Sequence, residues 1–383
     1  MDLTIKNFNA KKLLSNFHIV ELFYIVVLLA IPLQKYLHNH YNNFTIFRYS
    51  TRHFFAGTNL YLEYPKEYYD VFLYNPTFPV LFAPFAYLPV LAGMITWVAF
   101  TLLIFYLAIR NLPFSLNQRL FIYAFTFLEL VTSVANLQTN PLVTAFILFT
   151  FIYLEKGAAV KSGAFPGLGF FIKGYGVISG ALVFAKRSDF KYYLWALIWV
   201  IVLICLPIIH YSPAGIVTLY RQWGESLFHE HSINTGISVM GMISAVFGIN
   251  NELNFIQISA IIITALTILF IFIMKNYEQV KTMLLASLMI FVVIFNHDAE
   301  SATYIIASTG VAIWYINSRR SWLDTALLVI TFILTVLSPS DIFPAYIRRT
   351  IVAPYSLKAL GPFLVWLKAE YSIFSTSAAK DID

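Results

Sequence analysis

The stretch LYNPTFPVLFAPFAYLP, residues 73–89, carries four prolines in an otherwise apolar segment. A proline in a helix interior costs about 3 kcal/mol or more, because it removes a hydrogen bond and clashes with the preceding turn. The stretch therefore predicts a break where the chain enters an apolar environment, either as a short re-entrant piece or as a second span kinked by proline. Irregular backbone inside a bilayer is tolerated only where protein or a watery cavity covers it.

The composition of the chain places it in a membrane. Of its 383 residues, 59% are hydrophobic and only 11% are charged, against roughly 25% charged residues in a typical soluble domain. Since a span needs about 20 residues, this length allows roughly ten crossings. We therefore expect an all-α polytopic membrane protein with one integral membrane domain over residues 1–383. The net charge of +6 does not indicate a nucleic-acid partner, because the basic residues form short clusters between apolar runs.

The order of apolar runs and basic clusters predicts a topology. Residues 1–18 are polar and carry three lysines, which indicates a cytoplasmic tail. Two longer polar segments, 34–78 and 211–236, then fall on the opposite side as extracytoplasmic loops. In the first loop, phenylalanines segregate from arginines with a rough helical period, so we expect a helix lying on the membrane surface. The predicted spans are 19–33, 88–109, 120–135, 142–154, 193–209, 255–274, 283–295, 302–316 and 326–337.

Residues 163–185 depart from this simple alternation. The segment is long enough to span, but a single crossing would place Lys186, Arg187 and Lys191 outside, against the usual distribution of positive charge. It is also rich in glycine, with Lys173 at its centre. These features predict a re-entrant hairpin of two short helices, with the lysine at its tip facing a cavity.

Signatures of soluble enzymes are missing from the sequence, which has no glycine-rich phosphate loop, no paired CxxC, no HExxH and no GxSxG. His229 and His231 have the spacing of loop ligands but lack a third ligand nearby, so no metal site is expected. The turn NHDAES, residues 296–301, gathers His297, Asp298 and Glu300 between two apolar runs. This turn can hold a proton donor or a phosphate, or it can be a tight polar turn at the interface.

Polar residues concentrate in segments that all fall on one side of the predicted topology. This pattern indicates chemistry at one membrane surface, on a substrate whose tail lies in lipid and whose head is polar. Aromatic side chains would pack the lipid chain, and Arg48, Lys173 or Arg221 would neutralise a phosphate.

Six motifs in order give the chain a family resemblance. They are GTNLY, LYNPTFPVLFAPFAYLP, NLQTNPLVTAFILFTFIYLEKG, GFFIKGYGVISGALVFAKR, HSINTGISVMGMI and NHDAESATYIIASTGVAIWY. Their order and spacing, from about residue 43 to 316, resemble glycosyltransferase family 87, and the AES and NPTF variants resemble its Bacteroidetes-type branch. The resemblance implies a GT-C-like bundle of roughly 10–12 transmembrane helices. It also implies transfer of a sugar, often mannose, from a polyprenyl-phosphate carrier to a lipid or glycan acceptor outside a bacterial inner membrane.

The resemblance also bears on site residues. Inverting transfer needs a carboxylate base, and the family's aspartate position corresponds to Asn43, whose amide cannot act as a base. Three alternatives follow: Asp70 supplies the carboxylate, Glu300 supplies it from the other end of the site, or the protein has lost transfer chemistry and only binds. His297 and Glu300 would lie near the carrier phosphate, and no cofactor is implied beyond the lipid-linked donor. The expected substrate-binding residues are Asn43, Arg48, Tyr74, Asn75, Gln138, Asn140, Lys173, Arg221, His231 and Asn234.

Two other functions compete with a transferase. A flippase or transporter for a lipid-linked sugar would share an aromatic cavity but needs access from both faces, whereas the polar segments lie on one side. A non-catalytic subunit of an envelope complex would account for Asn43 directly and would have membrane-complex partners.

Overall fold

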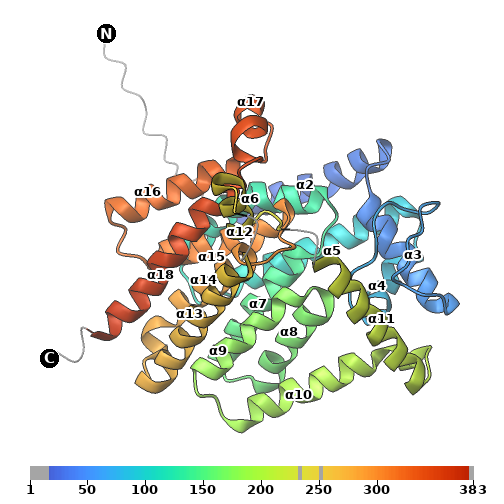
Figure 1. The fold of residues 1–383 in the computed structure, drawn as a ribbon, viewed down its shortest axis with the longest axis horizontal. Coiled ribbons are helices and arrows are strands. Elements are labelled where there is room, and N and C mark those ends of the chain that lie inside the picture. Colours follow the sequence, from blue (N-terminus) through green and yellow to red (C-terminus); the bar gives the residue numbers. More distant parts are fainter. Residues whose placement is uncertain (1–16, 232–234, 250–252, 379–383) are drawn as a thin grey trace.

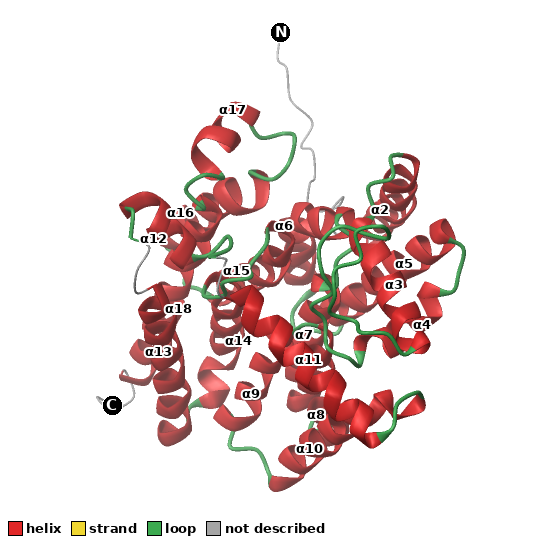
Figure 2. Cartoon of the chain, turned by 45° about the vertical axis from the view of Figure 1, so that its right-hand side comes forward, coloured by secondary structure: helices red, strands yellow, loops and turns green. Residues whose placement is uncertain are grey.

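The structure is a computed structural model that describes residues 17–231, 235–249 and 253–378. These residues form helices and connecting loops (Figures 1 and 2). The longer helices are α2 Phe17–Leu37, α3 Asn42–Ala56, α4 Phe78–Ala86, α5 Val90–Arg110, α6 Leu116–Ala135, α7 Asn140–Glu155, α8 Ala159–Ile172, α10 Phe190–Cys205, α11 Pro213–His231, α12 Val239–Phe247, α13 Leu253–Met274, α14 Tyr277–Ile294, α15 Tyr304–Asn317, α16 Trp322–Thr331 and α18 Leu360–Ala378. The shorter ones are η1 Gly174–Ser179, α9 Gly180–Ala185, η2 Leu206–Ile209, η3 Ser301–Thr303, η4 Phe332–Leu337, α17 Ala345–Ile347, η5 Arg348–Val352 and η6 Leu357–Ala359.

The helices confirm a polytopic all-α membrane protein. Within the described part of the chain, five helices are long and apolar enough to cross a membrane: Val20–Leu37, Val90–Arg110, Phe190–Ile209, Leu253–Met274 and Tyr277–Ile294. A sixth candidate is a pair of helical segments bent by 91°, and four apolar helical segments are shorter, at 10–17 residues. On α13, Ile258, Ile262 and Leu266 are exposed at helical spacing, as expected of a lipid-facing surface.

The centre of the molecule is formed by α7, α14 and α15, which pack on one another. Nearly every side chain of α7 and α15 is buried, the pattern of a helix surrounded on all sides. The close approach of α15 to α14 requires Gly310, where a Cβ atom would lie 2.8 Å from the carbonyl oxygen of Ala286. Small residues at such crossings are typical of membrane helix packing.

The predicted hairpin at residues 163–185 is present as a broken helix. Helix α8 ends at Ile172, Lys173 is extended, and the chain continues in η1 and α9. The two arms touch at Gly169 and Gly176, where a Cβ on Gly176 would lie 2.3 Å from the Cα of Gly169. Only glycine fits at this contact, which explains the glycine-rich sequence.

The proline-rich stretch forms a separate short helix, so of the two alternatives for this stretch the structure has the short piece and not a kinked second span. Pro79 lies in the first turn of α4, where its missing N–H is not needed. Pro89 directly precedes α5, so the chain turns between the two helices. Helix α4 packs on α5 closely enough that a Cβ on Gly93 would lie 2.6 Å from the carbonyl oxygen of Phe85.

Helix α11 accounts for most of the segment 211–236, which was predicted as an extracytoplasmic loop. Trp223 and Leu227 of this helix line the cavity described below. The prediction for the first loop is corrected. The helix predicted in the first loop is α3, but Phe44, Phe47 and Phe54 are buried within the protein. Ring contacts of Phe44 and Phe47 with Phe82 of α4 hold this face, so its apolar side does not face lipid.

Candidate functional site

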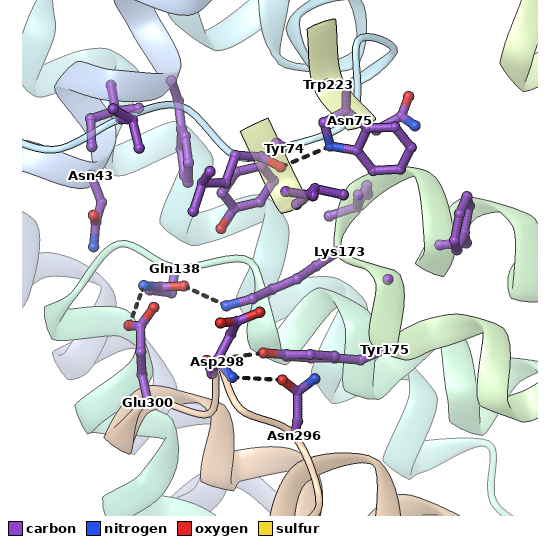
Figure 3. A pocket seen from close by; sticks show the side chains of 18 of the residues that line it. Asn43, Tyr74, Asn75, Gln138, Lys173, Tyr175, Trp223, Asn296, Asp298 and Glu300 are labelled. Atoms are coloured by element: carbon purple, nitrogen blue, oxygen red, sulfur yellow. Dashed lines mark hydrogen bonds between the residues drawn. The ribbon is translucent and has the colours of Figure 1, made fainter. Parts of the chain in front are cut away.

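A cavity of about 500 Å³ lies where six separate parts of the chain meet; we call it the central cavity. Its walls come from the start of α3, the loop before α4, the turn before α7, the break between α8 and η1, helix α11, and the turn after α14 (Figure 3). The lining residues that carry polar side chains or tryptophan are Asn43, Asp70, Tyr74, Asn75, Gln138, Lys173, Tyr175, Trp223, Asn296, Asp298 and Glu300.

Gln138 joins two charged groups across the cavity. Its Nε2 donates to Oε2 of Glu300 at 2.9 Å, and its Oε1 accepts from Nζ of Lys173 at 3.3 Å (Figure 3). Lys173 reaches this point because the break after α8 leaves it in extended conformation. The amide therefore holds one anion and one cation at fixed positions without pairing them directly.

The turn after α14 brings two carboxylates to the cavity. Residues 296–299 form a turn closed by a hydrogen bond from the Ala299 N–H to the Asn296 carbonyl at 3.3 Å, and Glu300 follows in extended conformation. Asp298 and Glu300 line the cavity, whereas His297 and Ala299 are buried and do not line it. The turn is held by Asn296, whose Oδ1 accepts from the Asp298 backbone at 2.7 Å, and by the Tyr175 hydroxyl, which donates to the Asp298 carbonyl at 3.2 Å.

The opposite wall brings Asp70 to the start of α3. Asn42 and Tyr69 are joined by two hydrogen bonds, from Asn42 Nδ2 to the Tyr69 carbonyl at 2.8 Å and from the Tyr69 N–H to Asn42 Oδ1 at 3.0 Å. Their neighbours, Asn43 and Asp70, both line the central cavity. Asp70 has φ of +75°, in the left-handed region. Aspartate tolerates this conformation, whereas most other residues with a side chain would lose about 1–2 kcal/mol in it.

An aromatic and amide surface completes the cavity. The Tyr74 hydroxyl lies 3.3 Å from the Thr139 hydroxyl, and burial raises the pKa of Tyr74 above its ordinary value, so it stays a neutral hydrogen-bonding group. Trp223 of α11 donates to the Leu73 carbonyl at 3.0 Å. Asn75 is buried, and its Oδ1 accepts from Tyr220 of α11 at 3.2 Å. These bonds tie α11 over the loop that carries Asp70.

Other residues expected from the sequence lie elsewhere. Arg48 lines a different cavity, and exposed Arg221 on α11 is paired with Glu225 at 4.0 Å. Asn140 lies behind the cavity lining and donates to Gln138 Oε1 at 3.5 Å. The His231 side chain and Asn234 lie outside the described residues.

Asp298 lines the cavity although it was not among the expected catalytic or substrate-binding residues; the sequence placed it only in the polar turn 296–301. The signal that could have selected it is its position two residues before Glu300, since both carboxylates lie between two apolar runs. The cavity thus collects three carboxylates, Asp70, Asp298 and Glu300, and one cation, Lys173. In the described residues, no group of three or more histidine, cysteine, aspartate or glutamate side chains is arranged to hold a metal ion.

Comparison with known proteins gives one match. The family model of glycosyltransferase family 87 matches residues 72–295, more than half of the chain. No curated protein and no solved structure matches. The matched region includes Tyr74, Gln138 and Lys173, whereas Asp70 and Glu300 lie just outside its two ends.

Proposed function

Because this chain belongs to glycosyltransferase family 87, and is therefore a membrane glycosyltransferase, we propose that it moves a hexose, mannose in the first instance, from a polyprenyl-phosphate carrier to an acceptor hydroxyl. The acceptor would be a lipid or a glycan, and the transfer would invert the sugar's configuration.

The hydrogen-bonded junction of Asn42 with Tyr69 is the observation that carries the proposal. The family resemblance puts a base at position 43, where this chain has an amide. The junction brings the Asp70 carboxylate to the same wall as Asn43. We assign Asp70 as the base that replaces the missing aspartate.

In the proposed reaction, each part of the transfer is assigned to a group that lines the cavity. Asp70 accepts the proton of the acceptor hydroxyl as that oxygen forms a bond to the sugar C1. The bond from C1 to the carrier phosphate oxygen breaks on the opposite face of the sugar, and its electron pair leaves with the phosphate. Lys173 lies across the cavity, where its ammonium group stabilises the charge that develops on this phosphate.

Gln138 and Glu300 keep Lys173 in place. Glu300 attracts the ammonium, but Gln138 stands between them and prevents a direct ion pair that would compete with the phosphate. Trp223 and Tyr74 supply aromatic surface for the sugar or the first part of the lipid chain.

The charge distribution supports an extracytoplasmic cavity. Helix α7 starts at Asn140 beside the cavity and ends at Glu155, about 22 Å away at roughly 1.5 Å per residue. At that far end, Lys186 lies 3.0 Å from Glu155, and Lys281 also contacts it. Lysines gather on the cytoplasmic side of membrane proteins, so the cavity faces the other side of what we propose is a bacterial inner membrane.

Purified protein with polyprenyl-phosphate mannose and an envelope extract as acceptor source tests the proposal. Release of polyprenyl phosphate is measured by mass spectrometry for the wild type, Asp70→Asn and Glu300→Gln. Asp70→Asn keeps the size and the tolerance of left-handed backbone, so we expect loss of turnover with unchanged donor binding. Turnover by Asp70→Asn but not by Glu300→Gln would move the base to Glu300. Donor binding without turnover by the wild type would indicate a binding protein instead.

A further inference from the structure

A second cavity, of about 510 Å³, adjoins the same junction; we call it the arginine cavity. Asn42 and Tyr69 line it, whereas their neighbours Asn43 and Asp70 line the central cavity. The other polar groups of its wall come from α3 and from the segments on either side. They are Asn39, Tyr41, Thr45, Arg48, Tyr49, Arg52, Glu67 and Tyr68.

Two arginines dominate the charge of this cavity. Arg48 and Arg52 lie four residues apart on α3, so they share one face of the helix. Glu67 is the acidic member of the wall, and its Oε2 is bonded to His53 at 2.8 Å. The described residues show no ion pair for either arginine. Among the described residues, two arginines against one glutamate give the wall of this cavity a net positive charge.

Of the two arginines, Arg48 gives the stronger indication of a bound anion. Its Nη1 is shielded from solvent and has no hydrogen-bond partner among the described residues. Burial, and then the neighbouring Arg52, lower the pKa of Arg48. A shielded guanidinium donor without an acceptor is unfavourable, and an anion in the cavity would supply the acceptor.

The ends of two candidate membrane spans border the arginine cavity. The candidate span of α2 ends at Leu37, just before Asn39 and Tyr41, and the span of α5 begins at Val90, which also lines the cavity. Helices α2 and α5 pack together. A Cβ on Gly93 of α5 would lie 2.8 Å from the ring of Phe44 on α3, so α3 also touches α5. Tyrosines 41, 49, 68 and 69 surround the arginines, as aromatic residues do at a membrane interface.

From these observations we propose that the arginine cavity binds the phosphate of a membrane lipid headgroup through Arg48 and Arg52. The planar guanidinium group matches phosphate oxygens with paired hydrogen bonds. The site does not depend on the proposed transfer reaction. Only the further step, in which this lipid is the acceptor held next to Asp70, rests on the proposed function.

The test measures binding of phosphatidylglycerol to the purified protein in a non-ionic detergent by native mass spectrometry. We expect the double variant Arg48→Gln with Arg52→Gln to lose at least about tenfold in affinity, because charged hydrogen bonds to the phosphate are removed. Arg48→Lys with Arg52→Lys should retain part of the binding. Arg221→Gln is the matched control, since Arg221 is an arginine that lines neither cavity, and its affinity should equal that of the wild type.

Three outcomes would overturn the proposal: no phosphatidylglycerol binding by the wild type, equal affinity in the glutamine variant, or an equal loss in Arg221→Gln. If the double variant does not fold, exposed Arg52→Gln alone carries the test. Calorimetry with glycerol 1-phosphate distinguishes a soluble phosphate from a lipid as the ligand. Binding of this compound that depends on the arginines would show that the phosphate group suffices. No binding of this compound would show that the lipid is needed. A rise in acceptor KM in the glutamine variant, with donor binding unchanged, would identify the lipid as acceptor. Unchanged transfer kinetics would identify a structural lipid.

Discussion

Gln138 donates a hydrogen bond from its Nε2 to the carboxylate of Glu300, at 2.9 Å and across 162 positions of sequence. The same side chain accepts from Lys173 at 3.3 Å. Three turns that the sequence separates widely are therefore positioned by one amide. The site depends on this contact because its charged groups otherwise come from independent parts of the chain.

Replacing Gln138 should impair the site without unfolding the protein. In Gln138→Met, both hydrogen bonds are lost and Lys173 is free to pair with Glu300 directly. We expect kcat/KM to fall by about tenfold to a hundredfold. A tenfold fall corresponds to about 1.4 kcal/mol, which is roughly the contribution of one hydrogen bond. Steady-state kinetics with the lipid-linked donor measures the change. Gln279→Met removes an exposed amide from α14 and should leave the rate unchanged; an equal loss in both variants would contradict the assigned role.

The hairpin at 163–185 gives a stability prediction. In Gly169→Ala, the added methyl group would lie 2.7 Å from the Cα of Gly176, so the two arms must separate. Overpacking of this kind costs about 1–3 kcal/mol, and we expect a lower unfolding temperature in detergent together with lost activity.

Gly180→Ala is the control for the hairpin, because Gly180 belongs to the same segment and has no atom within 4 Å of the added Cβ. It should unfold at the temperature of the wild type. If Gly169→Ala were as stable as Gly180→Ala, the close contact of the two arms would be disproved.

A buried ion pair supports the turn that carries Glu300. Nζ of Lys358 lies 2.8 Å from Oε1 of Glu129, and it donates to both the carbonyl and the hydroxyl of Ser301, at 3.0 and 2.8 Å. In Lys358→Met, the buried Glu129 loses its partner, which costs about 3–5 kcal/mol. Removing both charges, with Glu129→Leu added, should recover part of the unfolding temperature.

Activity should respond differently from stability in these two variants. The contact with Ser301 is absent in both, so the adjacent Glu300 is less well positioned and the rate should stay low even where stability returns. A double variant no more stable than Lys358→Met would show that the two charges are not coupled. Thermal unfolding and turnover, measured on the same preparations, separate the two effects.

The sequence could predict those features that depend on local composition. The glycine-rich segment with central Lys173 predicted the broken helix. A single continuous span would have placed the positive residues that follow it on the extracytoplasmic side, and the glycines allow the chain to turn back. The prolines of 73–89 likewise predicted a break but left two alternatives, and the structure has the short helix α4 and not a kinked span. Helix α11 was missed, since its proline, glycine and charged residues are typical of loops and its helical state depends on contacts such as those of Tyr220 and Trp223 with the first loop.

The site was harder to predict because helical geometry separates neighbours in sequence. Asn43 and Arg48 are five residues apart on α3, which turns them by roughly 140° about the helix axis. They therefore line different cavities, although both were expected at one substrate. His297 and Asp298 are adjacent in the turn 296–299, yet His297 is buried and does not line the central cavity, whereas Asp298 lines it.

The assignment of Asp70 as a replacement for position 43 makes a restoration experiment possible. Asn43 lines the same wall, and its Nδ2 donates to the Asn136 carbonyl at 2.8 Å. In Asn43→Asp with Asp70→Asn, the carboxylate moves back to position 43. We expect this double variant to turn over the donor faster than Asp70→Asn alone, because a base is again present at the wall.

The recovery should be incomplete, because aspartate cannot donate to the Asn136 carbonyl and repels it, at a cost of about 1–3 kcal/mol. Asn43→Asp alone provides the control for that cost and should be less stable than the wild type by a similar amount. Comparison of product formation by the double variant and by Asp70→Asn shows whether a carboxylate at position 43 can replace the one at position 70. No gain, in a double variant shown to be folded and to bind the donor, would mean that positions 43 and 70 do not serve the same acceptor hydroxyl.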